Sequence, residues 1–134
     1  MPKNDSPIER IMPEGSPPPV APYSHAAAYK DLVFVTGQMP LDPETNTYIR
    51  GSAAEQLDAC MRNLETILDA AKTDWSRVLH VRIFMTDFSR YDELNEAYKA
   101  WFPEGGFPAR TCVGVTGLAG GAEVEVDLVA VRGD

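Results

Sequence analysis

A long amphipathic helix, predicted to begin after Ser52, constrains the fold of this chain more than any other feature. Glu55 follows Ser52 at the spacing of a capping box, in which each side chain bonds the backbone of the other residue. Apolar residues then recur at helical spacing, at Leu57, Cys60, Met61, Leu64, Ile67, Leu68 and Ala71. Charged residues take the opposite side, so the helix has one apolar stripe that a sheet or another helix must cover.

Strand patterns flank this helix on both sides. β-rich runs at residues 26–29 and 32–36 are separated only by Lys30 and Asp31, which is typical of a tight hairpin. After a predicted turn, a short third strand is expected around Tyr48 and Ile49. Three more strands are predicted at residues 78–85, 110–115 and 123–128.

A second helix is predicted between the strands at 78–85 and 110–115. Ser89 can cap it, and its apolar stripe consists of Tyr91, Leu94, Tyr98, Trp101 and Phe102. The order βββαβαββ predicts an α+β fold, with a mixed six-stranded sheet and two helices packed on one face. The other face of the sheet would be uncovered in a monomer, so we expect a closed homo-oligomer that buries it.

Residues 1–19 are predicted to form a proline-rich extended arm, and residues 20–134 a single domain. Seven of the eleven prolines lie within the first 22 residues. Proline excludes a helix interior and an interior strand, because it lacks the backbone N–H and fixes φ.

Composition excludes several classes of partner. The formal net charge of −8 opposes binding to nucleic acid and to anionic membranes, because both depend on clustered Lys and Arg. Cys60 and Cys112 are the only cysteines, and their spacing suggests neither a zinc site nor a redox pair. We expect both to be reduced thiols. No apolar run is long enough for a membrane span and no secretory signal is evident, so a cytoplasmic protein is expected.

Arg110 is the strongest candidate for holding an anion. It begins a strand whose other residues are small or apolar, and a buried guanidinium needs a planar, bidentate anionic partner. Glu123, Glu125 and Asp127 share one face of the last strand, which we expect beside that of Arg110. A cleft there could hold a carboxylate substrate on Arg110 and a water on a glutamate. A structural Arg–Glu pair predicts the same sequence, and that alternative stays open.

Metal and cofactor chemistry are disfavoured. His25 and His80 have no acidic neighbours at ligand spacing, so no metal site is expected. The sequence has no glycine-rich nucleotide loop and no legible nucleophile–histidine–acid order, so we expect no cofactor and no covalent catalysis.

Four motifs together resemble the RidA/YjgF family of reactive-intermediate deaminases. They follow one another in order and are PYSHA at residues 22–26, FVTGQMPLDP at 34–43, NEAY at 95–98 and FPARTCV at 107–113. The resemblance implies a chorismate-mutase-like α+β protomer and a homotrimer with a central barrel and clefts between subunits. It also implies cofactor-independent hydrolysis of enamines and imines, such as 2-aminoacrylate, to 2-keto acids and ammonia.

The resemblance also assigns site residues. Arg110 matches the arginine that binds the substrate carboxylate, and Glu125 matches the acid that positions the attacking water. The expected substrate-binding residues are Tyr23, Thr36, Gly37, Asn95 and Cys112, with the Cys112 thiol itself a bystander. Thr36, Gly114 and the segment 119–121 depart from the commonest family pattern, and the N-terminal arm is longer. The changes beside the cleft put the substrate in question more than the reaction.

Other functions stay open at this point. One is a pathway-specific relative, such as a 2-aminomuconate deaminase. A second is a non-catalytic module that senses a carboxylate metabolite. RNA cleavage has been attributed to family members, but the charge of −8 argues against it.

Overall fold

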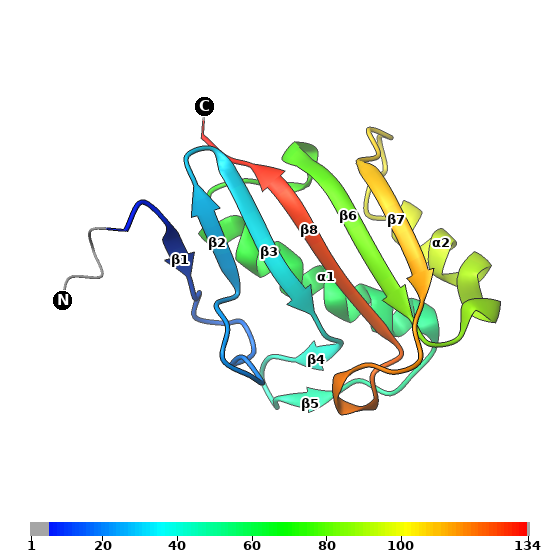
Figure 1. Ribbon diagram of the computed structural model, residues 1–134. Coiled ribbons are helices and arrows are strands. Elements are labelled where there is room, and N and C mark those ends of the chain that lie inside the picture. The colour runs from blue at the N-terminus through cyan, green and yellow to red at the C-terminus, as the bar shows by residue number, and fades with distance from the viewer. Residues whose placement is uncertain (1–5, 134) are drawn as a thin grey trace.

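The computed structural model describes residues 6–133 of the chain (Figure 1). Its two helices are α1 (Ala53–Ala70) and α2 (Tyr91–Lys99). Its strands are β1 (Glu9–Ile11), β2 (Ala26–Tyr29), β3 (Leu32–Gln38), β4 (Leu41–Asp42), β5 (Thr47–Tyr48), β6 (Val78–Met85), β7 (Ala109–Gly114) and β8 (Val124–Val131). Short 3₁₀ turns occur at Trp75–Arg77, Phe88–Arg90 and Ala119–Gly121.

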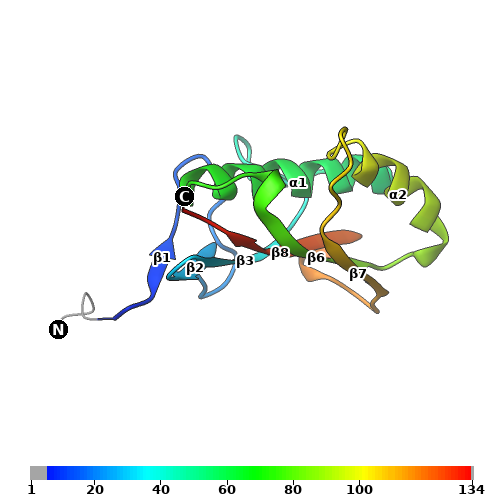
Figure 2. The ribbon, with the colours of Figure 1, turned by 90° about the horizontal axis from the view of Figure 1, so that it is seen from above.

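Six strands form one mixed sheet in the order β1-β2-β3-β8-β6-β7. Adjacent strands are antiparallel except β6 and β7, which are parallel because α2 carries the chain back across the sheet between them. Both helices cover the same face of the sheet, as Figure 2 shows from above. The predicted α+β architecture, with two helices on one face of a six-stranded mixed sheet, is therefore confirmed.

The identity of the six strands differs from the expectation in two places. The predicted strand around Tyr48 is β5, which pairs only with β4 in a separate two-stranded sheet. The sixth strand comes instead from the N-terminal arm, where β1 pairs with β2. Proline is tolerated at a sheet edge, where one row of backbone groups is unpaired, so the arm can supply a short edge strand.

The capping box predicted at the start of α1 is present. The Ser52 hydroxyl accepts a hydrogen bond from the Glu55 N–H at 3.1 Å, and the Glu55 carboxylate accepts one from the Ser52 N–H at 2.9 Å. All seven residues of the predicted apolar stripe are buried against the sheet, which contributes Val33, Val81, Ile83, Val126 and Leu128 to the same core. The helix therefore covers the centre of the sheet, as its pattern requires.

The start of the second helix differs from the expectation. Ser89 does not cap α2, because a 3₁₀ turn at Phe88–Arg90 precedes the helix. Asp87 caps that turn instead, and its carboxylate accepts hydrogen bonds from both the N–H and the hydroxyl of Ser89. An aspartate two residues earlier therefore starts the helical segment.

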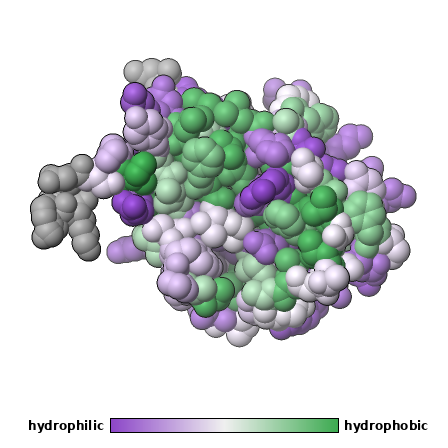
Figure 3. Space-filling view, in the orientation of Figure 1, coloured by the Kyte–Doolittle hydropathy of each residue, from purple (hydrophilic) through white to green (hydrophobic). Residues whose placement is uncertain are grey.

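The sheet face opposite the helices is open and partly apolar. In Figure 1 this face is turned toward the viewer, and the space-filling view in Figure 3 shows apolar patches across it. Ala27, Phe34, Val129 and His80 lie in register across four strands of this face. Phe34 is 52% exposed. No helix of the described residues is long and apolar enough to cross a membrane.

Candidate functional site

Arg110 lies in β7 and reaches toward α2. Its Nη2 donates hydrogen bonds to the Tyr91 hydroxyl at 3.0 Å and to Asn95 Oδ1 at 2.8 Å. Its guanidinium carbon lies 4.9 Å from the centre of the Tyr98 ring, a distance typical of a cation–π contact. The other guanidinium nitrogens have no acceptor, and no carboxylate pairs with Arg110, within residues 6–133. The Nη2 side of the Arg110 guanidinium is therefore held in place, and its other N–H groups are available to an anion.

The α2 sequence explains how this setting forms. Tyr91, Asn95 and Tyr98 recur at helical spacing, so they share the face of α2 that meets β7. Tyr98 is buried, and its hydroxyl has no hydrogen-bond partner within the described chain. Burial raises the pKa of Tyr98 to about 12, although the charge of Arg110 opposes this shift. The phenol is therefore neutral and stacks beneath the guanidinium. The sequence pattern placed both tyrosines in the apolar stripe and missed their contact with Arg110.

Gly37 and Glu125 lie against each other in the middle of the sheet. The pairing of β3 with β8 shifts register between Val35 and Gln38, so an extra residue bulges from β3 at this point. A Cβ atom added to Gly37 would overlap the Glu125 carboxylate and lie 2.9 Å from its Cδ. Only glycine therefore leaves room for the carboxylate where it stands.

Glu125 is the acid of β8 that is free to act on a ligand. Asp127, two residues later on the same face, is held by Arg82 through two hydrogen bonds of 3.0 and 2.6 Å. No cation pairs with Glu125 within the part of the chain that the structure describes. Burial, and secondly the negative charge of Asp127, raise the pKa of Glu125 above its ordinary value. A half-buried carboxylate of raised pKa is a suitable general base.

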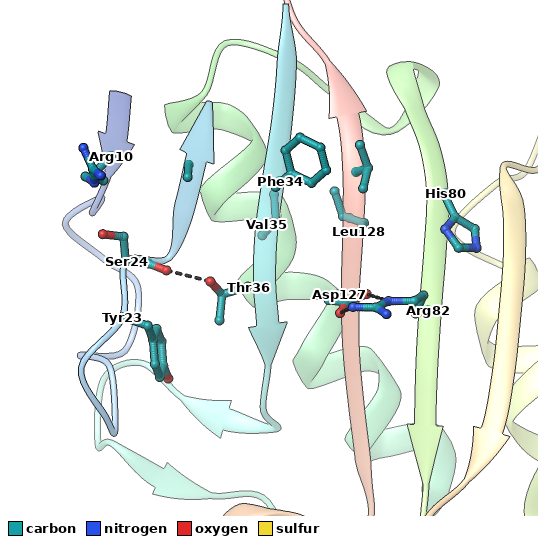
Figure 4. A pocket seen from close by; sticks show the side chains of 12 residues that line it. Arg10, Tyr23, Ser24, Phe34, Val35, Thr36, His80, Arg82, Asp127 and Leu128 are labelled. Carbon is teal, nitrogen blue, oxygen red and sulfur yellow. Dashed lines mark hydrogen bonds and ion pairs between the residues drawn. The ribbon is translucent and has the colours of Figure 1, made fainter. Parts of the chain in front are cut away.

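Tyr23 and Thr36 line a cavity of about 720 Å³ on the open face (Figure 4). The Thr36 hydroxyl donates to the Ser24 carbonyl at 2.6 Å, which ties β3 to the segment that carries Tyr23. Asp127 and Arg82 line the same cavity. The structure therefore places Tyr23, Thr36, Gly37 and Glu125 along neighbouring parts of the open face.

The strand that carries Arg110 does not border the last strand, so that expectation is wrong. β6 lies between β7 and β8, because α2 leads to a strand parallel to β6 whereas β8 inserts on the other side of β6. Arg110 is in register with Val81, and Glu125 with Phe84. Val81 and Phe84 are three residues apart on β6, and residues an odd number apart point to opposite faces of a strand. Arg110 therefore faces the helices, whereas Glu125 faces the open side.

Cys112 follows Arg110 on the helix-facing side of β7. Its thiol lies 3.8 Å from the sulfur of Met85, and burial raises its pKa despite the nearby charge of Arg110. Both cysteines are free thiols. The protonated Cys112 thiol packs inward, so only its backbone is placed to meet a ligand at the edge of β7.

Tyr48 lies near Glu125, and the sequence did not indicate this neighbour. Its ring packs on Gly120, where an added Cβ would overlap the ring, and Gly120 has a φ of +64°. Arg50 lies 5.1 Å over the same ring and donates to the carbonyls of Gly120 and Gly121. Burial and the proximity of Tyr23 raise the pKa of Tyr48, with a smaller contribution from Glu125. Gly120 therefore makes room for an aromatic ring beside Glu125.

The candidate site consists of two halves that a single chain keeps apart. One half is the cation at the β7 edge, with Arg110, Asn95 and Tyr91. The other half is the acid on the open face, with Glu125 against Gly37. No cluster of three His, Cys, Asp or Glu side chains that could hold a metal ion occurs within residues 6–133. An unpaired guanidinium edge and an unpaired, half-buried carboxylate are groups suited to anion binding and to general-base catalysis.

Comparisons with known proteins cover nearly the whole chain. Residues 14–132 match the family model described as Endoribonuclease L-PSP. The human 2-iminobutanoate/2-iminopropanoate deaminase is 30% identical over 118 residues, which cover 88% of this chain and 85% of the human protein. The crystal structure of E. coli TdcF with bound serine superposes with a TM-score of 0.88 at 28% identity, covering 93% of this chain and 99% of TdcF. That of the E. coli YjgF gene product does so with a TM-score of 0.88 at 27% identity, and the shares covered are again 93% and 99%.

Proposed function

Because the chain belongs to the RidA/YjgF family, we propose that it is a cofactor-independent deaminase of reactive enamines and imines. Its substrates would be 2-aminoacrylate and related 2-imino acids, and its products 2-keto acids and ammonia. The human relative is named for this activity on 2-iminobutanoate and 2-iminopropanoate. The crystal structure of TdcF contains bound serine, which is an amino acid with a free carboxylate.

One observation carries the proposal: Arg110 offers a fixed, unpaired guanidinium edge. The hydrogen bonds to Tyr91 and Asn95 hold the group, and the remaining N–H groups match the two oxygens of a carboxylate. A bound carboxylate orients the adjacent C=N carbon for attack, and orientation supplies much of the rate enhancement in such reactions.

The reaction then needs only water and proton transfers. The enamine tautomerises to the imine, and Glu125 takes a proton from a water that adds to the C2 carbon. A proton on the imine nitrogen completes the carbinolamine. A second proton on that nitrogen, with loss of the hydroxyl proton, then expels ammonia and forms the C2 carbonyl of the keto acid. Glu125 can return the proton, because its raised pKa means that it holds a proton more readily than an ordinary glutamate does.

The two halves of the site would meet between protomers. Arg110 and Glu125 lie on opposite faces of their own sheet, so an active site that uses both requires two copies of the chain. The open face around Phe34 is the surface that such an assembly would bury, and a homotrimer gives three equivalent clefts. We propose a homotrimer with its sites between neighbouring subunits.

Phe34→Asp is expected to disrupt this assembly. A carboxylate at the centre of an apolar interface loses its hydration, so association should weaken by at least about 100-fold. Sedimentation velocity should show monomers at concentrations at which wild type is trimeric, and deaminase activity should be lost with the trimer. Phe34→Leu keeps the surface apolar and should remain a trimer. If Phe34→Asp assembled like wild type, the open face would not be the interface.

Gly37→Ala is expected to lower kcat/KM about tenfold while leaving the fold intact. The new methyl group would displace the Glu125 carboxylate, and a base moved by a fraction of an ångström transfers protons less efficiently. Gly117→Ala is the matched control, since an added Cβ there meets no atom within 4 Å. Equal activity in both variants would show that the position of Glu125 does not matter.

The direct test couples the protein to a dehydratase that releases 2-aminoacrylate. Ammonia and pyruvate should appear faster than by spontaneous hydrolysis, in proportion to the protein added. If the protein binds pyruvate or serine but does not accelerate hydrolysis, the cleft is a metabolite sensor rather than an enzyme.

A further inference from the structure

The proline-rich segment before β2 is joined to the rest of the chain by few hydrogen bonds. Within residues 6–133, only two hydrogen bonds join residues 13–20 to other segments. The Pro17 carbonyl bonds the ring of His25, and the Val20 N–H bonds the hydroxyl of Tyr23. The segment therefore links a buried histidine to the tyrosine that lines the open-face cavity.

His25 anchors this segment to the core. Its side chain is buried, and its Nε2 lies 2.6 Å from the Pro17 oxygen. Its Nδ1 lies 3.2 Å from the amide nitrogen of Gln38, which also donates to the Thr36 carbonyl at 3.1 Å. A carbonyl oxygen only accepts, so Nε2 carries the ring hydrogen, and Nδ1 accepts from Gln38. One ring thus connects the arm to the bulge of β3 beside Gly37.

Three consecutive prolines bridge the two contact points. Pro17 carries the anchored carbonyl, and Pro18 and Pro19 separate it from the N–H of Val20. A run of prolines is stiff and loses little conformational entropy on folding, so fixing one end restricts the other. The position of Val20 therefore depends on the hydrogen bond at His25.

The Val20 contact determines how Tyr23 can act. The Tyr23 oxygen accepts the Val20 N–H at 3.2 Å, so the hydroxyl hydrogen remains available to a ligand or water in the cavity. The Tyr23 ring also meets the His25 ring edge to face, with centres 6.0 Å apart. Figure 4 shows Tyr23 beside Thr36 at the border of the cavity.

We propose that His25 is a positioning residue for the deamination, which acts through the proline segment to hold the Tyr23 hydroxyl toward the substrate. This inference rests on the proposed function, and it gives the N-terminal arm a role in the site. His25 touches no substrate itself. Its effect on the reaction passes through Tyr23.

A double-mutant cycle tests this dependence. His25→Phe keeps a ring but removes both ring hydrogen bonds, and Tyr23→Phe removes the hydroxyl. Each is expected to lower kcat/KM for 2-iminopropanoate about tenfold, the value of one hydrogen bond, and the double variant should be no worse than either. His25→Gln keeps a donor for the Pro17 carbonyl and should restore most of the activity. Additive losses in the double variant, or full activity in a folded His25→Phe trimer, would overturn the proposal.

Pro18→Gly provides a second route that leaves His25 intact. It loosens the segment between the two hydrogen bonds, so it should lower kcat/KM, as His25→Phe does. In the Tyr23→Phe background it should have no further effect. If His25→Phe fails to fold, this variant decides the question. Wild-type activity in Pro18→Gly would then contradict the proposal.

Amide hydrogen exchange separates this inference from the proposed function. The Val20 N–H donates a hydrogen bond to the Tyr23 hydroxyl, so its exchange should accelerate about tenfold in His25→Phe, with the α1 amides unchanged. If wild type shows no deaminase activity but Val20 exchanges as expected, the deaminase proposal fails. The link from His25 through the proline segment to Tyr23 is then still supported. Unchanged exchange of the Val20 amide in His25→Phe would refute the link from His25 to Tyr23, whether or not the protein is a deaminase.

Discussion

Replacing Arg110 with alanine is expected to lower kcat/KM for 2-iminopropanoate by about 100- to 1000-fold. Removing one partner of a desolvated, hydrogen-bonded charge pair costs roughly 2–5 kcal/mol, and each 1.4 kcal/mol corresponds to tenfold. The loss should appear in both KM and kcat, because the guanidinium both binds the carboxylate and orients the C=N carbon. Steady-state release of ammonia from enzymatically generated imine measures it.

Two control variants separate charge from geometry. Arg110→Lys keeps a positive charge but cannot form two parallel hydrogen bonds or stack on Tyr98, so it should recover only part of the loss. Arg62→Ala removes an arginine from the exposed side of α1 and should behave as wild type. If Arg110→Ala retained full activity, the carboxylate would have to bind elsewhere and the proposed mechanism would be wrong.

The layout of the fold was predictable because it depends on local patterns. The capping box, the apolar stripe of α1 and the alternation along β8 each specify an element, and their order specifies one covered sheet face. The hairpin at Lys30 also formed as expected, with this residue in the left-handed region at a φ of +53°. The source of the sixth strand was not predictable, because a three-residue edge strand between prolines has no periodicity of its own.

The contacts of the site were harder to predict than its residues. The resemblance to the family named Arg110, Glu125, Tyr23, Thr36, Gly37, Asn95 and Cys112. No pattern in one sequence, however, shows which strand lies between two others. β6 separates the two strands, and its register with each of them places the cation and the acid on opposite faces of the sheet. The tyrosines of α2 were read as core residues, because an apolar stripe does not reveal which of its members meets a charge.

The alternation along β8 did not by itself set apart the acid of the open face, which only the resemblance to the family singled out. Glu125 and Asp127 are spaced alike along β8, and only the ion pair with Arg82 distinguishes them. Because Arg82 forms an ion pair with Asp127, Glu125 is the unpaired carboxylate, and it lies beside Gly37. Long-range pairing of side chains thus decides which of two similar acids can act as a base.

The pH dependence of activity is expected to follow the unusual protonation of Glu125. Burial raises the pKa of this carboxyl, and Asp127 raises it further. The ionised form is the base, so kcat/KM above the spontaneous rate should rise with pH through an apparent midpoint above the ordinary value of 4.5. Asp127→Asn removes the repulsion and should shift that midpoint to lower pH. A midpoint that does not respond to this substitution would assign the titration to another group.

Glu125→Gln is expected to lower kcat about 100- to 10,000-fold, the usual contribution of a general base, and to leave the oligomeric state as in wild type. The same substitution should not lower the stability of the folded protein, and should raise it at high pH. Because the raised pKa means that the folded protein holds this proton more tightly than the unfolded chain does, stability falls as pH rises through the raised pKa. The amide removes that penalty, so thermal unfolding of Glu125→Gln at pH 8 should occur at or above the wild-type temperature. A variant that lost both activity and stability would indicate a structural role for the carboxylate, whereas loss of activity alone identifies a group retained for the reaction at some cost to the fold.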